Sequence, residues 1–481
     1  MTQSGNHKST LNRLLVIAVP MVISQASDTV MLFFDRLFLS RLGGEFLAAS
    51  MSGGLSQFMV SSFFFGTIGY VTAVVAQYYG AEKYERCAVA TFQAVVLSIL
   101  SYPIILAASP LIKTLFTALG QTPLQVELAY TYYHTLIFGV VVLLLRYAMA
   151  GFFIGIGRTR VVMIANAAGM IINLPANYVL IYGKFGFPEL GLRGAAVGTI
   201  LGNLVILIIL AVFYFRLTNR VEYKTHKAFN FDGEIFRTLV KFGVPAGIEM
   251  FLNVAAFNLF VQMMHTYGTN VAAAVTISFN WDIVAFLPML GMGHAVTSLA
   301  GQCVGAGDLT EARKVTVTGL KTAWVYSGTM VLVFLLFARP LTSLFLPAGP
   351  EAAEIGRLAE ILLRLASIYI LADSAQIVFV GALRGAGDTH WVMAASVVMH
   401  WCMAGIAFYL IRILKADPVG AWIGFIGFIV LLGVVMYFRF RGGKWEKIDM
   451  IGGKADHIDC RHSSGINPEI GCEELIDESQ L

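Results

Sequence analysis

Charged side chains are scarce in this sequence. Asp, Glu, Lys and Arg make up 13% of its 481 residues, whereas 57% are hydrophobic, and the mean hydropathy is +0.75. Soluble globular domains average about 25% charged residues. The scarcity excludes an ordinary soluble enzyme or binding module, and it predicts an all-α polytopic membrane protein without an extended soluble domain.

Signatures of covalent and ATP-driven chemistry are missing as well. The sequence has no Gly-Lys-Ser phosphate loop, no HExxH, no GxSxG and no CxxC pair. We therefore expect no enzymatic activity, no cofactor, no nucleic-acid partner and no obligate protein partner. The five cysteines follow no recurring spacing, which argues against a disulfide framework. Zinc-ligand types occur near the C-terminus at a spacing that fits no standard site, so we predict no metal centre: His457, Cys460, His462 and Cys472.

Long apolar runs fill the rest of the chain. Runs bounded by Gly, Pro and charge clusters predict twelve membrane spans. The first six lie near 14–38, 47–78, 88–110, 128–152, 161–182 and 194–215. The second six lie near 239–265, 271–303, 315–337, 355–381, 391–413 and 418–438.

The basic residues predict the orientation. An even number of spans places both termini on one side, and Lys and Arg gather in the loops of that side. The positive-inside rule therefore predicts cytoplasmic termini in a cell (inner or plasma) membrane. The expected units are a cytoplasmic N-terminus (1–13), a first lobe (14–215), a cytoplasmic linker (216–238), a second lobe (239–440) and a flexible tail (441–481).

The two halves repeat each other. Val19-Pro20 recurs 225 residues later as Val244-Pro245, and Gln77-x-x-Gly80-Ala81 recurs at the same offset as Gln302-x-x-Gly305-Ala306. Farther on, the segment GIGRTRVVM from Gly155 corresponds to GAGDTHWVM from Gly385, at an offset of 230. Because each copy has six spans, both copies enter the membrane the same way and are parallel repeats with a cavity between lobes. Such duplication favours alternating-access transport over a channel or a rigid scaffold.

Ionisable residues inside the predicted first-lobe spans are candidates for function. Asp28 and Asp35 lie seven residues apart on one face of the first span. A charge near the bilayer centre costs at least ~2.5–3.5 kcal/mol, so such residues usually face a partner or a water-filled cavity. We expect Asp35 to couple ions, although bonding to a neighbour near the interface is an alternative. Arg146 either pairs with a first-lobe carboxylate or binds an anionic part of a substrate.

The second lobe carries its own candidates. Glu249 follows Pro245 by four residues, and Asn253 lies one turn beyond on the same face. Asp282 and Asp373 are expected near mid-membrane, and Glu249, Asn253, Asp282 and Asp373 complete the predicted ion-coupling set. Trp281, next to Asp282, is a substrate-cavity candidate together with Asp28 and Arg146, since aromatic faces attract cations.

Several motifs together resemble one transporter family. They are FFDRLFLSRLG after the first span, VAQYYGA after the second, the run from Asn166 to Thr199, and GALRGAGDT from Gly381. Over about residues 11–440 the chain resembles the multidrug and toxic compound extrusion (MATE) transporters. The resemblance implies a V-shaped pair of six-helix bundles that exports organic compounds in exchange for H⁺ or Na⁺.

The resemblance also implies roles for single residues. Asp35 matches the acidic residue of the first helix that the family uses in coupling, and Asp373 matches its second-lobe carboxylate. Bacterial sodium-coupled members carry Glu where this chain has Asn253, which puts a sodium site of the usual kind in doubt. The expected function is secondary active efflux of organic, drug-like cations. Alternatives are a flippase for a lipid-linked precursor and an exporter of an anionic metabolite.

Overall fold

The computed structural model describes residues 9–118, 122–346 and 351–452, and every regular element in these ranges is a helix. The first half of the chain contains α1 (Thr10–Ser40), α2 (Gly44–Gly69), α3 (Val71–Gly80), α4 (Tyr84–Ala118), α5 (Pro123–Phe138), α6 (Val140–Gly155), α7 (Thr159–Tyr182) and α8 (Gly191–Tyr214). The second half contains α10 (Gly233–His265), α11 (Thr269–Gly305), α12 (Leu309–Ser343), α13 (Ala352–Ala386), α14 (Thr389–Phe408), the π-helical turn η2 (Tyr409–Ile413) and α15 (Pro418–Arg441). Between the halves lie α9 (Leu217–Glu222) and η1 (Thr225–Lys227).

The number of spans agrees with the sequence. Within the described residues, eleven helical segments are long and apolar enough to cross a membrane, and the pair α5–α6, bent by 46°, brings the number to twelve. Large apolar side chains point outward along these helices, such as Leu336 at 70% and Phe337 at 53% exposed. A surface of this kind suits lipid rather than water. The predicted all-α, twelve-span fold in two lobes is confirmed.

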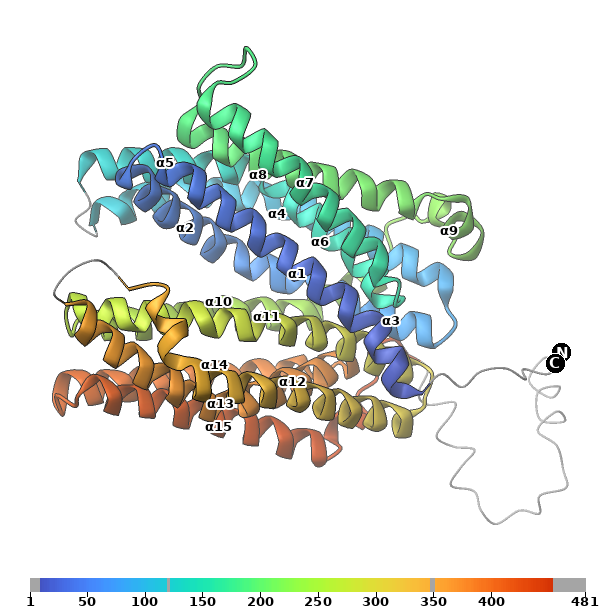
Figure 1. The fold of residues 1–481 in the computed structure, drawn as a ribbon. Helices are drawn as coiled ribbons and strands as arrows, with labels where there is room; N and C mark the ends of the chain where they lie inside the picture. The colour runs from blue at the N-terminus through green and yellow to red at the C-terminus, as the bar shows by residue number, and fades with distance from the viewer. Residues whose placement is uncertain (1–8, 119–121, 347–350, 453–481) are drawn as a thin grey trace, which may run out of the picture.

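The two lobes meet at one end of the molecule and diverge toward the other (Figure 1). The end at which they meet carries α9, η1 and both ends of the described chain, and we call it the linker end. The largest inter-lobe contacts join α2 to α10, α1 to α11 and α3 to α11. These pairs exchange roles between the halves, as expected of parallel repeats related by a pseudo-two-fold axis.

The start of each lobe's first helix packs into the hydrophobic core of the other lobe. Leu14 and Ile17 of α1 are buried in the second-lobe core, and Ile235 and Leu239 of α10 are buried in the first-lobe core. Both helices therefore cross between the lobes at the linker end, as α1 does visibly in Figure 1. Motion between the lobes has to move these two helices.

The repeated glutamines join the lobes at the linker end. The side-chain amide of Gln77 on α3 donates to the carbonyl oxygen of Gly385 on α13 over 2.8 Å. Its counterpart Gln302 on α11 donates to the carbonyl oxygen of Gly155 on α6, also over 2.8 Å. We call these two reciprocal contacts the glutamine pair. The motif found by repeat analysis therefore forms a two-fold contact between the lobes.

The glycines of the same motif let the backbones approach. A methyl group added at Gly80 would overlap the backbone carbonyl oxygen of Gln302, and one at Gly305 would overlap that of Gln77. Only a residue without Cβ fits such a close helix approach. The Gln-x-x-Gly repeat thus supplies both the hydrogen bond and the space that it needs.

The start of the predicted tail packs against both lobes. In η3 (Lys444–Lys447), Trp445 is buried in the second-lobe core, and Glu446 pairs with Arg313 over 2.5 Å. Met450 is buried in the first-lobe core, where its sulfur lies 3.4 Å from the Tyr70 hydroxyl. The tail from residue 453 onward, including the zinc-ligand types at His457, Cys460, His462 and Cys472, lies outside the described residues.

Candidate functional site

Asp35 is buried among neutral hydrogen-bond donors. Its side chain on α1 is 3% exposed. The amide nitrogen of Asn177 on α7 donates to one carboxylate oxygen, and the hydroxyl of Thr199 on α8 donates to the other over 2.7 Å. The neighbouring Arg36 is exposed. Asp35 therefore makes its polar contacts in the lobe interior with neutral side chains, not with Arg36, a setting in which a bound cation or proton would offset a costly charge.

Asn177, which donates to Asp35, belongs to a row of asparagines on α7. Asn166, Asn173 and Asn177 face α1, and Asn177 also donates to the side-chain oxygen of Asn173 over 3.2 Å. Their spacing of seven and four residues puts them on one helix face. Sequence reasoning assigned them no role, although this spacing was a usable signal.

Gly198 makes room for this arrangement. A methyl group at this position on α8 would overlap the side-chain oxygen of Asn177. The close packing of α7 on α8 thus depends on the glycine that directly precedes Thr199, the second residue that donates to the Asp35 carboxylate. The local sequence Gly198-Thr199 is what brings an amide and a hydroxyl to the same carboxylate.

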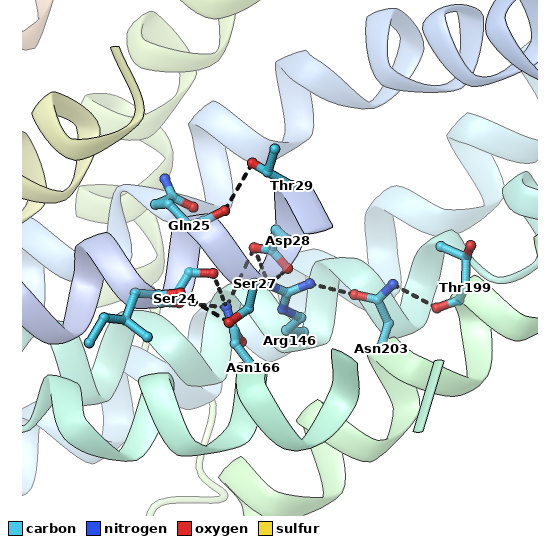
Figure 2. Close-up of polar contacts among 10 residues, drawn as sticks. Ser24, Gln25, Ser27, Asp28, Thr29, Arg146, Asn166, Thr199 and Asn203 are labelled. Carbon is cyan, nitrogen blue, oxygen red and sulfur yellow. Dashed lines mark hydrogen bonds and ion pairs between the residues drawn. The ribbon is translucent and has the colours of Figure 1, made fainter. Parts of the chain in front are cut away.

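Asp28 forms an ion pair with Arg146 (Figure 2). One terminal nitrogen of the guanidinium on α6 lies 2.8 and 2.7 Å from the two carboxylate oxygens. The other donates to the side-chain oxygen of Asn203 on α8 over 2.6 Å. Of the two interpretations left open for Arg146, the structure shows pairing with a first-lobe carboxylate.

Hydrogen bonds connect this pair to Asp35. The amide nitrogen of Asn203 donates to the backbone carbonyl of Thr199 over 2.8 Å, and the Thr199 hydroxyl in turn donates to Asp35. Figure 2 shows the part of this chain from Asp28 through Arg146 and Asn203 to Thr199. The two carboxylates of α1 thus belong to one polar network in the first lobe.

Glu249 and Asn253 of the second lobe contact different side chains. The Glu249 carboxylate, 3% exposed as a whole residue, pairs with the guanidinium of Arg384 on α13 over 2.8 Å. Asn253 donates to the hydroxyl of Ser396 on α14 over 2.9 Å. The cation expected near Glu249 is, in this conformation, an arginine of the chain itself.

Asp282 and Asp373 form a second group in that lobe. Asp282 on α11 accepts a hydrogen bond from the hydroxyl of Tyr369 on α13 over 2.8 Å. Asp373, one turn farther along α13, has no hydrogen bond or ion pair within the described residues, and the charge of Asp282 acts on it. Trp281 donates its indole N–H to the carbonyl of Leu341 on α12 over 3.0 Å. Its ring therefore lies against α12.

Comparison with known proteins places the chain in a family. The MatE family model matches residues 20–179 and 245–408, one segment in each lobe. A probable multidrug resistance protein NorM of Bradyrhizobium diazoefficiens is 30% identical over 432 residues, which is 89% of this chain and 92% of that protein. This chain belongs to the MATE family of efflux transporters. A NorM protein of the same description from Thermotoga maritima is 28% identical over 90% of this chain and 93% of its own length.

Solved structures of MATE transporters share the fold. A multidrug resistance MATE family transporter of the MOP superfamily, solved in the outward-facing conformation, superposes with a TM-score of 0.83 at 22% identity, covering 92% of this chain and 98% of that one. A MOP superfamily transporter from Pyrococcus furiosus, described as having a binding pocket of reverse polarity, gives the same TM-score, identity and coverage. At this identity the likeness concerns the fold, and the chemistry of the site must come from the residues above.

Proposed function

We propose that this MATE transporter exports organic, drug-like cations in exchange for H⁺ or Na⁺ by alternating access, with Asp35 as the coupling carboxylate of the first lobe. The observation that carries the proposal is the setting of Asp35, which is almost fully buried and bonded only to neutral groups. Such a carboxylate gains from binding a small cation, since two hydrogen bonds from neutral groups compensate only part of the desolvation of its charge.

Coupling requires that the site binds the ion and the substrate with different affinity in the two conformations. Oxygen atoms suited to a proton or to Na⁺ lie beside the carboxylate, namely the Thr199 hydroxyl and the side-chain oxygen of Asn173, which accepts from the same Asn177 amide that donates to Asp35. Movement of α1 against α7 and α8 would change all of these contacts together. In this view α1 carries the coupling signal, because it also crosses into the second lobe.

The predicted orientation in the membrane indicates on which side the transporter is closed. With both termini in the cytoplasm of a cell with a plasma membrane, the linker end is the cytoplasmic end. The lobes are joined there by the glutamine pair, so the arrangement corresponds to a transporter closed to the cytoplasm.

The side chains favour a cationic over an anionic substrate. Arg146, the basic residue that could have bound an anion in the first lobe, has both terminal nitrogens engaged by Asp28 and Asn203. The second lobe offers Asp282 and also Asp373, which has no hydrogen-bond or ion-pair partner among the residues that the structure describes. Relatives described as probable multidrug resistance proteins support the drug-like part of the proposal.

The test is efflux of a fluorescent organic cation from vesicles that contain the purified protein, under an imposed pH gradient or an imposed Na⁺ gradient. Wild type, Asp35→Asn and Asp373→Asn are compared, with Glu127→Gln as a control for loss of an exposed carboxylate on α5. We expect flux driven by one gradient, lost in Asp35→Asn and retained in the control.

Flux that keeps its gradient dependence in Asp35→Asn would refute Asp35 as the coupling group. If no flux occurs under either gradient, and if an anionic metabolite or a lipid-linked precursor binds to the purified protein, the alternative functions are supported instead. These are export of an anionic metabolite and flipping of a lipid-linked precursor.

A further inference from the structure

The buried polar network of the first lobe contains two acids and one base. Around Asp35, α7 and α8 present the neutral side chains described above, α5 presents Tyr132, and α1 itself carries the exposed Arg36. Around Asp28, α6 presents Arg146 and Tyr147, and α7 presents Asn166. Arg146 is therefore the cation that balances one of the two α1 carboxylates.

The geometry decides which carboxylate is balanced. Arg146 has an 11% exposed side chain, and its two terminal nitrogens bond Asp28 on one side and Asn203 on the other. A guanidinium is a rigid planar fork, so contacts at both terminal nitrogens fix its direction. Asn203 is itself anchored to the Thr199 carbonyl. The guanidinium is thus held at the level of Asp28 and cannot turn toward Asp35 without breaking these bonds.

We propose that Arg146 is a positioning residue: held by Asn203, it neutralises Asp28 and leaves Asp35 as the single exchangeable negative charge on α1. The inference deepens the proposed function, since it rests on Asp35 being the coupling group. Two unbalanced carboxylates on α1 would bind cations at two coupled sites, and a base that reached Asp35 would remove the exchange altogether. The Asp28–Arg146 pair excludes both outcomes and sets one cation per cycle for this helix.

The proposal makes an electrostatic prediction with a sign. Asp28 and Asp35 are two helical turns apart, roughly 10 Å along α1. At an effective dielectric constant near 20, one unit charge at that distance shifts a titration midpoint by about one pH unit. Removing Arg146 leaves an extra negative charge, which favours protonation of Asp35. Removing Asp28 leaves an extra positive charge, which opposes it.

The experiment is an acid titration of the purified full-length protein in Na⁺-free detergent solution, followed by infrared difference spectroscopy of the carboxyl C=O stretch. The band that disappears in Asp35→Asn is assigned to Asp35. We expect its midpoint to move up by about one pH unit in Arg146→Met, down by about one in Asp28→Asn, and back to the wild-type value in the double variant. Arg364→Met, which breaks the pair between the exposed Arg364 and the partly buried Glu360 on α13, is the control and should leave the midpoint unchanged.

Shifts of opposite sign that cancel in the double variant distinguish charge balance from a structural role, because general loosening would move both single variants the same way. Shifts of the same sign, or none in folded protein, would overturn the proposal while leaving Asp35 as the coupling group. Failure to find an Asp35 band would instead refute the proposed function and this inference with it. If Arg146→Met does not fold, Asp28→Asn and the double variant carry the same test.

Discussion

Removing the glutamine pair should open the linker end. In the double variant Gln77→Leu/Gln302→Leu, the side chains keep a similar volume but lose the amides that bond Gly385 and Gly155. In the state with this end open, all four groups would be free to bond water. The two hydrogen bonds therefore stabilise only the conformation with this end closed. Their loss shifts the equilibrium between closed and open states and does not merely weaken the fold.

The size of the shift follows from the number of bonds. A hydrogen bond between neutral groups contributes about 1 kcal/mol net of water, so the pair contributes about 2 kcal/mol. Since about 1.4 kcal/mol changes an equilibrium constant tenfold, the double variant should favour opening by about 30-fold over wild type. Each single variant should give a smaller shift, and the two effects should be coupled, because Gln77 and Gln302 lie at the same close approach of α3 and α11.

The equilibrium can be read from inter-lobe distances. Spin labels at Arg160 on α7 and Thr310 on α12, both exposed at the linker end, report the separation of the lobes by pulsed dipolar spectroscopy in a cysteine-free background. We expect one short-distance population in wild type and a second, longer one in the double variant. A distribution identical to wild type, in protein with an unchanged unfolding midpoint, would show that the glutamine pair does not hold this end closed.

The glycines of the motif provide an independent perturbation. Gly80→Ala adds a methyl group that would overlap the Gln302 carbonyl, whereas Gly328→Ala adds one in the middle of α12 where no other atom lies within 4 Å. Gly80→Ala should shift the same label distances toward the open population, and Gly328→Ala should not. Equal behaviour of the two variants would contradict the close backbone approach.

Three further outcomes follow from single contacts. Gly198→Ala should abolish gradient-driven efflux much as Asp35→Asn does, since the new methyl displaces the amide that bonds Asp35; wild-type coupling would contradict this. The two ways of breaking the Glu249–Arg384 pair should lower the free energy of unfolding by different amounts, as measured by denaturation in detergent. Arg384→Met leaves a buried carboxylate without its partner and should cost about 3 kcal/mol. Glu249→Gln leaves a guanidinium that is one-third exposed and should cost less. Asn253→Glu adds a carboxylate one turn from Glu249 and should increase Na⁺-dependent stabilisation against heat above the wild-type level.

The fold could be predicted because its signals are local in the sequence. Apolar runs, glycine and proline at their ends, and the repeated motifs are each contained within a few dozen residues, and together they gave the twelve spans and the two parallel lobes. The repeat even identified Gln77 and Gln302, although not that each bonds the other lobe. What a side chain contacts depends on how the helices pack, and that information is spread over the whole chain.

The site shows the same limit. Asp35 stood out as an acid in an apolar span, but its ligands Asn177 and Thr199 lie 142 and 164 residues away. Glu249 stood out for the same reason, yet its partner Arg384 makes it half of an ion pair. An unusual residue can be found from composition, whereas whether it is neutralised, and so whether it can exchange an ion, is decided by packing.

The duplication itself argues for a division of labour between the lobes. At the offset of 225, Asp28 corresponds to Asn253, and at the later offset of 230, Asn166 corresponds to Ser396. The two pairs are bonded in equivalent ways, Asn166 to Asp28 over 3.4 Å and Asn253 to Ser396 over 2.9 Å, so the polar contact between first and fifth spans is kept while its charge is lost.

One helical level farther along, the divergence is complete. Asp35 corresponds to Phe260, which is fully buried and stacks on Phe425 at 4.6 Å between ring centroids. Phe260 has no group that titrates and no oxygen ligand for Na⁺, whereas the first lobe has its most buried carboxylate at the equivalent position. Equal lobes could bind ions in either half, whereas this pair cannot at this level. If Asp35 is the coupling group proposed above, the asymmetry favours ion exchange on α1 at this level, whereas the acids Asp282 and Asp373 of the second lobe lie on α11 and α13.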